Sequence, residues 1–71
     1  MEETIKEFAP HQQRVVDEKN ELEDRFKKLD SFILDNPIFT SLPQEDQDLL
    51  KEQNNLMQRY LSVLEKRIAR F

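Results

Sequence analysis

The first half of the chain carries apolar residues at helical spacing. They are Val15, Leu22, Phe26, Leu29 and Ile33, separated by steps of seven, four, three and four residues. Pro10 suits the first turn of such a helix, where the missing N–H has no intrahelical partner. Pro37 disfavours helical geometry at the residue before it. The pattern predicts a first amphipathic helix over residues 10–35, with a polar gap in its stripe at Lys19.

A second amphipathic helix is predicted over residues 42–70, after a connection of residues 36–41. Ser41, followed three residues later by Gln44, matches a capping box. Acidic residues then fill the first turn and basic residues the last turns, the signs that the helix dipole favours at each end.

Some large apolar residues lie outside these two helices. Ile38 and Phe39 fall in the connection, where we expect both to plug the end of a hairpin. Ile5 and Phe8 are placed so that an early helical turn would extend the first stripe.

The apolar arc of the second helix is too wide for one neighbour. It comprises Leu49, Leu50, Leu56, Met57, Leu61, Val63, Leu64, Ile68 and Phe71. At about 100° per residue these positions span roughly 160°. We therefore expect an all-α fold: residues 1–71 form a single antiparallel helical hairpin whose second helix also packs against another copy, giving a homo-oligomeric helix bundle.

Composition removes several functional classes. The 71 residues include no Cys, no Gly and one His, and the formal net charge is -4. Disulfides and structural zinc are therefore not expected, and neither are the glycine-rich loops that cradle phosphates. The acidic balance argues against binding to duplex nucleic acid. Without a basic leader or a long apolar run we expect no membrane partner, no metal and no cofactor, in a soluble cytoplasmic protein.

Three polar side chains interrupt the apolar arc of the second helix. Gln53, Tyr60 and Arg67 follow one another at seven-residue intervals and should point into an interface. If the residue numbers that face each other across the hairpin add up to about 79, Lys19 comes opposite Tyr60 and Gln12 opposite Arg67. The polar gaps of the two helices would then coincide.

The same end of the hairpin is rich in cations, contributed by His11, Arg14, Lys66 and Arg70. A guanidinium group donates two parallel hydrogen bonds to phosphate oxygens, an aromatic ring stacks on a base, and a side-chain amide forms hydrogen bonds with a base edge. The candidate ligand-binding residues are therefore Lys19, Tyr60, Arg67, Arg14, Gln12, Gln53, His11 and Arg70. Taken singly, each also fits a structural role, as a snorkelling cation, a register-setting amide or a core tyrosine.

Catalysis finds little support. His11 has no Ser, Cys or Asp at a nucleophile–base spacing, and adjacent carboxylates such as Glu45 and Asp46 point to different sides of a helix. We expect that the protein is not an enzyme. A small phosphodiesterase acting through His11 is the weakest alternative.

Residues 11–71 resemble a family of very short phage proteins. The likeness rests on His-Gln-Gln-Arg-Val-Val-Asp-Glu-Lys at 11–19, on Phe39-x-x-Leu42, and on the ending Tyr60-x-x-x-Leu64-x-x-Arg67-Ile68-x-x-Phe71. Small phage hairpins of this kind look like the oligomeric sponges that counter bacterial defence. Those sponges sequester nucleotide immune signals, either the cyclic oligonucleotides of CBASS or the ADP-ribose derivatives of Thoeris.

The resemblance implies capture of a signal between protomers, without turnover, in the cytoplasm of an infected bacterial host. It assigns no binding residue, so the candidates named above come from the helix pattern alone. An acidic helical module that docks on a host or phage protein through its apolar face stays open as the alternative.

Overall fold

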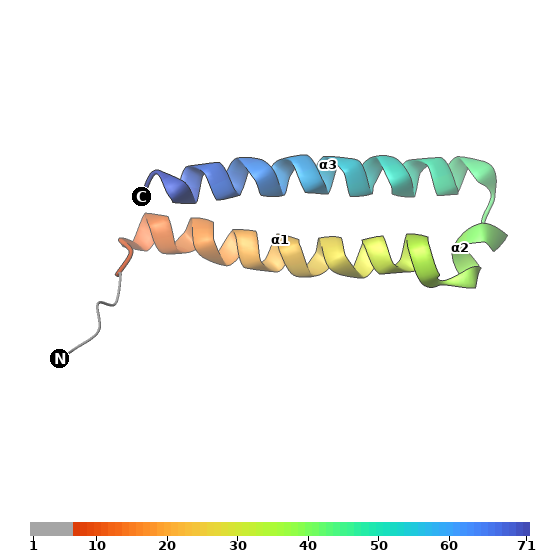
Figure 1. The fold of residues 1–71 in the computed structure, drawn as a ribbon, viewed down its shortest axis with the longest axis horizontal. Helices are drawn as coiled ribbons and strands as arrows, with labels where there is room; N and C mark the ends of the chain where they lie inside the picture. Colours follow the sequence, from red (N-terminus) through yellow and green to blue (C-terminus); the bar gives the residue numbers. More distant parts are fainter. Residues whose placement is uncertain (1–6) are drawn as a thin grey trace.

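The computed structural model describes residues 7–71 and consists of two long antiparallel helices joined by a short one (Figure 1). Helix α1 spans Pro10–Asp35, α2 spans Pro37–Ser41, and α3 spans Gln44–Ala69. The two long helices pack against each other along their length. The predicted all-α hairpin is therefore confirmed. Ile5, with its suggested extension of the first stripe, lies outside the described residues.

Helix α1 begins and ends at local signals. Pro10 occupies its first position, and the Ala9 backbone N–H donates to Gln12 Oε1 at 2.9 Å. Its last turn closes where the Asn36 backbone N–H donates to the Phe32 carbonyl at 3.2 Å, immediately before Pro37. The Gln12 side chain, a predicted ligand residue, thus binds the backbone at the helix N-terminus.

The connection forms a helix of its own. Asn36 Oδ1 accepts a hydrogen bond from the Ile38 backbone N–H at 2.9 Å, which satisfies a free donor at the start of α2. This turn places Phe39 in the core, 4% exposed, with its ring edge-on to Phe32 at a centroid distance of 6.1 Å. Ile38 is 57% exposed, so only one of the two predicted plug residues fills that role.

The predicted capping box of the second helix is wrong. Ser41 belongs to α2, and its hydroxyl donates to the Ile38 carbonyl at 2.6 Å instead of accepting from α3. The N-cap residue is Pro43, and the carbonyl of Leu42 is bound by the Gln47 side-chain amide at 2.8 Å. Because the extra turn of α2 takes up Ser41, α3 starts later than expected.

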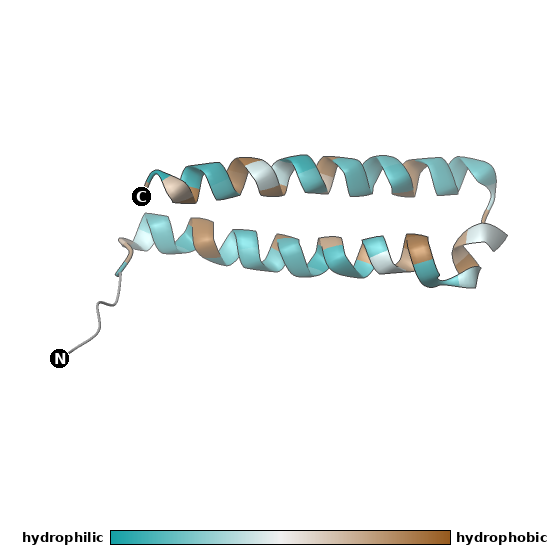
Figure 2. Cartoon of the chain, in the orientation of Figure 1, coloured by the Kyte–Doolittle hydropathy of each residue, from teal (hydrophilic) through white to brown (hydrophobic). Residues whose placement is uncertain are grey.

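The core is a thin layer between the long helices. Its buried members among the described residues are Val15, Phe39, Leu61 and Leu64. Figure 2 shows hydrophobic residues recurring as bands along both long helices, between broad hydrophilic stretches. At the open end of the hairpin, the rings of Phe8 and Phe71 meet edge-on at 5.9 Å. No helix within the described residues is both long enough and apolar enough to span a membrane.

Candidate functional site

Two parallel rows of side chains run along α3, one residue apart. The inner row faces α1 and consists of Leu50, Asn54, Met57, Leu61, Leu64 and Ile68, all buried or half-buried. The outer row consists of Leu49, Gln53, Leu56, Tyr60, Val63 and Arg67, all exposed. Both rows advance by alternating steps of four and three residues, so each keeps one face of the helix. One neighbouring helix covers the inner row only.

The outer row therefore keeps its apolar side chains in contact with solvent. Leu49 is 62% exposed, Leu56 54%, Val63 51% and Tyr60 44%. An open hollow of ≈ 370 Å³ lies here, and its surface is mostly apolar. It is lined by Leu49, Glu52, Gln53, Leu56, Met57 and Tyr60. The predicted ligand residues Gln53 and Tyr60 thus come together, with an apolar floor between them. Arg67 continues the same row two turns further on.

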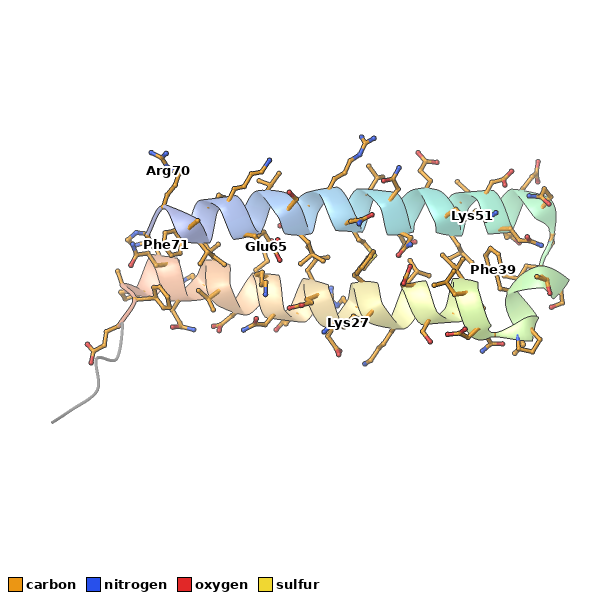
Figure 3. All side chains as sticks on the ribbon, viewed as in Figure 1. Lys27, Phe39, Lys51, Glu65, Arg70 and Phe71 are labelled. Carbon is orange, nitrogen blue, oxygen red and sulfur yellow. The ribbon has the colours of Figure 1, made fainter. Side chains whose placement is uncertain are left out.

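Lys19 takes part in a different cluster. Its Nζ lies 2.9 Å from Glu23 Oε1, and that hydrogen bond raises the pKa of Lys19 above its ordinary value, with Glu65 of α3 adding to the effect. The same hydrogen bond lowers the pKa of Glu23, and Lys27 assists from 3.6 Å. Glu65 is directed toward α1 in Figure 3. Lys19 therefore faces carboxylates rather than Tyr60.

The cause is the register of the hairpin. Asn54 on α3 donates to Asp30 on α1 at 3.1 Å, so the facing numbers add up to 84 near this pair instead of about 79. The shift of five residues puts Glu65, not Tyr60, across from Lys19. The expected coincidence of polar gaps is not found, because Tyr60 lies on the outer row and Lys19 lies between the helices.

The remaining candidates lie at the open end of the hairpin. Helix α1 begins where α3 ends (Figure 1), so exposed His11 and Arg14 lie at the same end as exposed Arg67 and Arg70. Figure 3 shows the Arg70 side chain directed away from α1. Lys66, on the same turn, is exposed as well. The cationic side chains at this end are therefore accessible to an anion from solvent.

A family model described as Sequestin matches residues 9–70. The chain belongs to the Sequestin family. None of the curated proteins and none of the solved structures matches it. The match to the Sequestin model takes in α1, α2, α3 and every candidate ligand residue.

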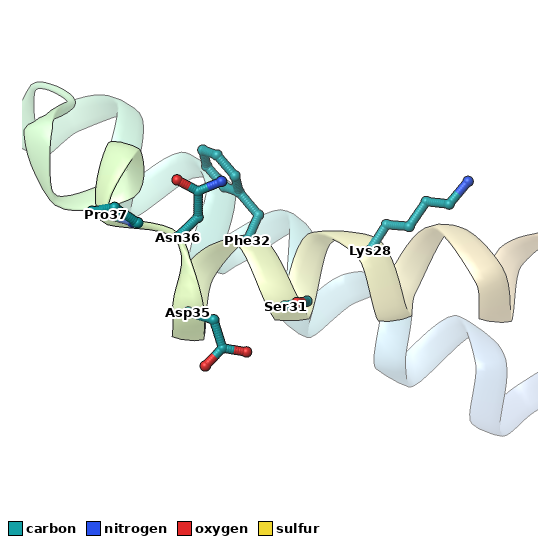
Figure 4. Close-up of a pocket in the computed structure, with 6 residues that line it drawn as sticks. All are labelled: Lys28, Ser31, Phe32, Asp35, Asn36 and Pro37. Atoms are coloured by element: carbon teal, nitrogen blue, oxygen red, sulfur yellow. The ribbon is translucent and has the colours of Figure 1, made fainter.

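A second hollow lies at the closed end of the hairpin. It measures ≈ 420 Å³ and is lined by Lys28, Ser31, Phe32, Asp35, Asn36 and Pro37. Figure 4 shows that the side chains of Lys28, Phe32 and Asp35 diverge. Because binding sites need polar groups that converge on one point, this hollow is a poor candidate. In the described part of the chain, no group of three or more His, Cys, Asp or Glu side chains could hold a metal ion.

Glu23 and Glu65 were not among the residues predicted to contact Lys19. The pairing of Lys19 with Glu23 could have been predicted from the sequence, because Glu23 follows Lys19 by four residues, the spacing at which opposite charges pair on a helix. Glu65 depended on the hairpin register and carried no comparable local signal.

Proposed function

We propose that this protein sequesters a small nucleotide-derived immune signal and holds it between copies of the chain without turnover. The ligand class is a cyclic oligonucleotide or an ADP-ribose derivative, and the setting is phage counter-defence in the cytoplasm of an infected bacterium. Membership of the Sequestin family carries the proposal, because the family is named for sequestration and its model spans both long helices.

The outer row of α3 supplies the chemistry that such a ligand needs. Tyr60 offers an exposed aromatic face. Gln53 lies in the same apolar hollow, where its exposed side-chain amide can rotate to donate or accept a hydrogen bond. Arg67, two turns further along, presents a guanidinium fork suited to phosphate oxygens. In one chain this site is open on one side, so a second copy is needed to enclose the ligand.

Isothermal titration against cyclic dinucleotides, cyclic trinucleotides and cyclic ADP-ribose isomers tests the proposal. We expect one class to bind, and both Arg67→Ala and Tyr60→Ala to weaken that binding at least tenfold. Arg25→Ala is the matched control, because Arg25 is exposed on α1 and should leave affinity unchanged. Absence of binding across the panel would contradict the proposal.

Capture without turnover has its own test. The ligand is incubated with the protein, the protein is denatured by heat, and the released ligand is analysed. Recovery of intact ligand supports sequestration. A hydrolysed product that disappears with His11→Ala would instead favour the phosphodiesterase alternative.

The exposed apolar residues also favour a second function, docking on another protein. Leu56 and Val63 are the residues to change, since they are exposed while Leu61 is 8% exposed and supports the hairpin itself. In that case Leu56→Ala should abolish capture of the partner, and Arg67→Glu should have the smaller effect. Nucleotide binding that requires Arg67 would decide against this function.

A further inference from the structure

The outer row of α3 has the spacing of a coiled-coil seam. Its steps of four and three residues continue beyond both ends, to Asp46 before Leu49 and to Arg70 after Arg67. Scattered exposed apolar residues are normal, but here Leu49, Leu56 and Val63 repeat every seven residues on one face. Such a seam is suited to a second helix of the same pitch.

The hairpin itself leaves room for further burial. Four residues of the described chain are buried, and Leu64 alone among them is fully enclosed. Chains of this length that lack disulfides and metals usually gain stability by association. Another copy of the chain is a partner that is always available for such association.

Charges along α3 indicate how that copy is oriented. The first half of the helix carries the acidic residues Glu45, Asp46, Asp48 and Glu52. The second half carries the basic residues Arg59, Lys66 and Arg67, and Arg70 follows directly after the helix. The two exceptions are directed inward: the ammonium of Lys51 lies 5.9 Å from the Phe39 ring centroid, and Glu65 lies beside Lys19. The charges that remain for a partner on α3 are therefore separated by sign.

We propose that two copies of this chain pair through the outer rows of their α3 helices, in antiparallel orientation. The acidic half of each α3 then faces the basic half of the other, and the two helix dipoles oppose each other favourably. A parallel pair would instead place acid against acid and base against base. The product is a four-helix bundle with two hairpins back to back.

The alternation of apolar and polar positions also sets the register. Overlap of the full seam places Asp46 of one copy opposite Arg70 of the other, Leu49 opposite Arg67, and Leu56 against Tyr60. The two Tyr60 rings then flank the twofold axis. The proposed function needs a second copy of the chain, and this arrangement gives that copy an orientation. Any role of the dimer in ligand capture rests on the proposed function.

Disulfide trapping tests the orientation, because the chain has no cysteine of its own. A mixture of Leu49→Cys and Arg67→Cys proteins is oxidised, and the products are identified by mass. The antiparallel pair predicts that the main product is the mixed disulfide between the Leu49→Cys and Arg67→Cys proteins. Asn55→Cys, exposed on another face of α3, is the control and should not cross-link with Arg67→Cys. Disulfide-linked homodimers of the Leu49→Cys protein alone, or no cross-linked product at all, would overturn the proposal.

Sedimentation equilibrium without ligand gives an independent test. Wild type should be dimeric at micromolar concentration, and Leu56→Glu should be monomeric while retaining its helical circular dichroism. Leu34→Glu is the control, because Leu34 is 72% exposed outside the outer row and should stay dimeric. A dimeric Leu56→Glu protein, or a monomeric wild type, would exclude this interface.

Charge exchange separates the two orientations once more. Asp46→Arg should weaken the dimer roughly tenfold, and the Asp46→Arg/Arg70→Asp double variant should recover most of the loss. Failure of the double variant to recover would contradict the antiparallel register. None of these measurements uses a nucleotide, so the dimer and the proposed ligand capture can fail separately.

Discussion

The side-chain amide of Asn54 donates to a carboxylate oxygen of Asp30 at 3.1 Å and joins the two long helices. Asn54 belongs to the inner row of α3, between Leu50 and Met57, where every other member is apolar. Its carbonyl oxygen is buried and accepts no hydrogen bond from the described part of the chain. The pair marks the register of the hairpin and leaves one polar atom unsatisfied.

Replacing Asn54 by leucine should stabilise the hairpin. The substitution removes a buried oxygen without a partner, whose desolvation costs about 1–3 kcal/mol. Asp30 is only half-buried, so its carboxylate can be solvated instead. We expect Asn54→Leu to raise the free energy of unfolding by about 1 kcal/mol in urea denaturation. Asn55→Leu, one residue away and exposed, should change it little. A clear loss of stability in Asn54→Leu would show that the hydrogen bond to Asp30 outweighs the unsatisfied oxygen.

The sequence predicted the long helices well because their signals are local. The spacing of Val15, Leu22 and Phe26 and the positions of Pro10 and Pro37 act within a few turns of chain. The width of the apolar arc likewise predicted that one neighbour would leave part of α3 uncovered. These features depend on helix geometry alone.

The pairing between helices was beyond the reach of local signals. The contact between Asp30 and Asn54 joins residues 24 positions apart, and the extra turn of α2 changes where α3 begins. A shift of five residues suffices to exchange Tyr60 for Glu65 opposite Lys19. Gln53 and Tyr60 line one hollow, and their relation could be predicted because it lies within one helix.

The short helix α2 should depend on its N-terminal cap. Asn36→Ala removes the acceptor of the Ile38 backbone N–H, and such losses cost about 0.5–2 kcal/mol. Phe39 is held in the core by this turn, so we expect the free energy of unfolding to fall by about 1 kcal/mol. Asn36→Asp keeps the acceptor and should retain most of the stability. Equal losses in the two variants would show that the cap does not depend on the side-chain oxygen.

Leu64 should be the most sensitive apolar position. Its side chain is completely buried, and truncation of such a leucine to alanine costs about 2–5 kcal/mol. A domain of this size has a total stability of roughly 4–10 kcal/mol, so Leu64→Ala should lower the melting temperature strongly in circular dichroism. Leu34→Ala, at a position 72% exposed, should shift it very little. A small effect at Leu64 would mean that the helices repack around the missing atoms.

The ion pair between Lys19 and Glu23 should make stability depend on pH at both extremes. Its hydrogen bond lowers the pKa of Glu23 from an ordinary 4.5 and raises that of Lys19 from an ordinary 10.5. Stabilisation by Glu23 is present above 4.5 and is lost as pH falls through its lowered pKa. Stabilisation by Lys19 is present below 10.5 and is lost as pH rises through its raised pKa.

Urea denaturation of wild type and Glu23→Gln over a pH series measures this contribution. The difference in unfolding free energy should stay level between about pH 6 and pH 9, and should shrink in strong acid and strong base as one partner loses its charge. Asp24→Asn is the control, because Asp24 pairs with Lys28 at 3.1 Å at the same spacing but with both side chains largely in solvent. A difference for Glu23→Gln that persists unchanged below the lowered pKa of Glu23 would show that its source is packing rather than charge. Since Lys19 donates its hydrogen bond to Glu23, that outcome would also return Lys19 to the set of cations available to a ligand.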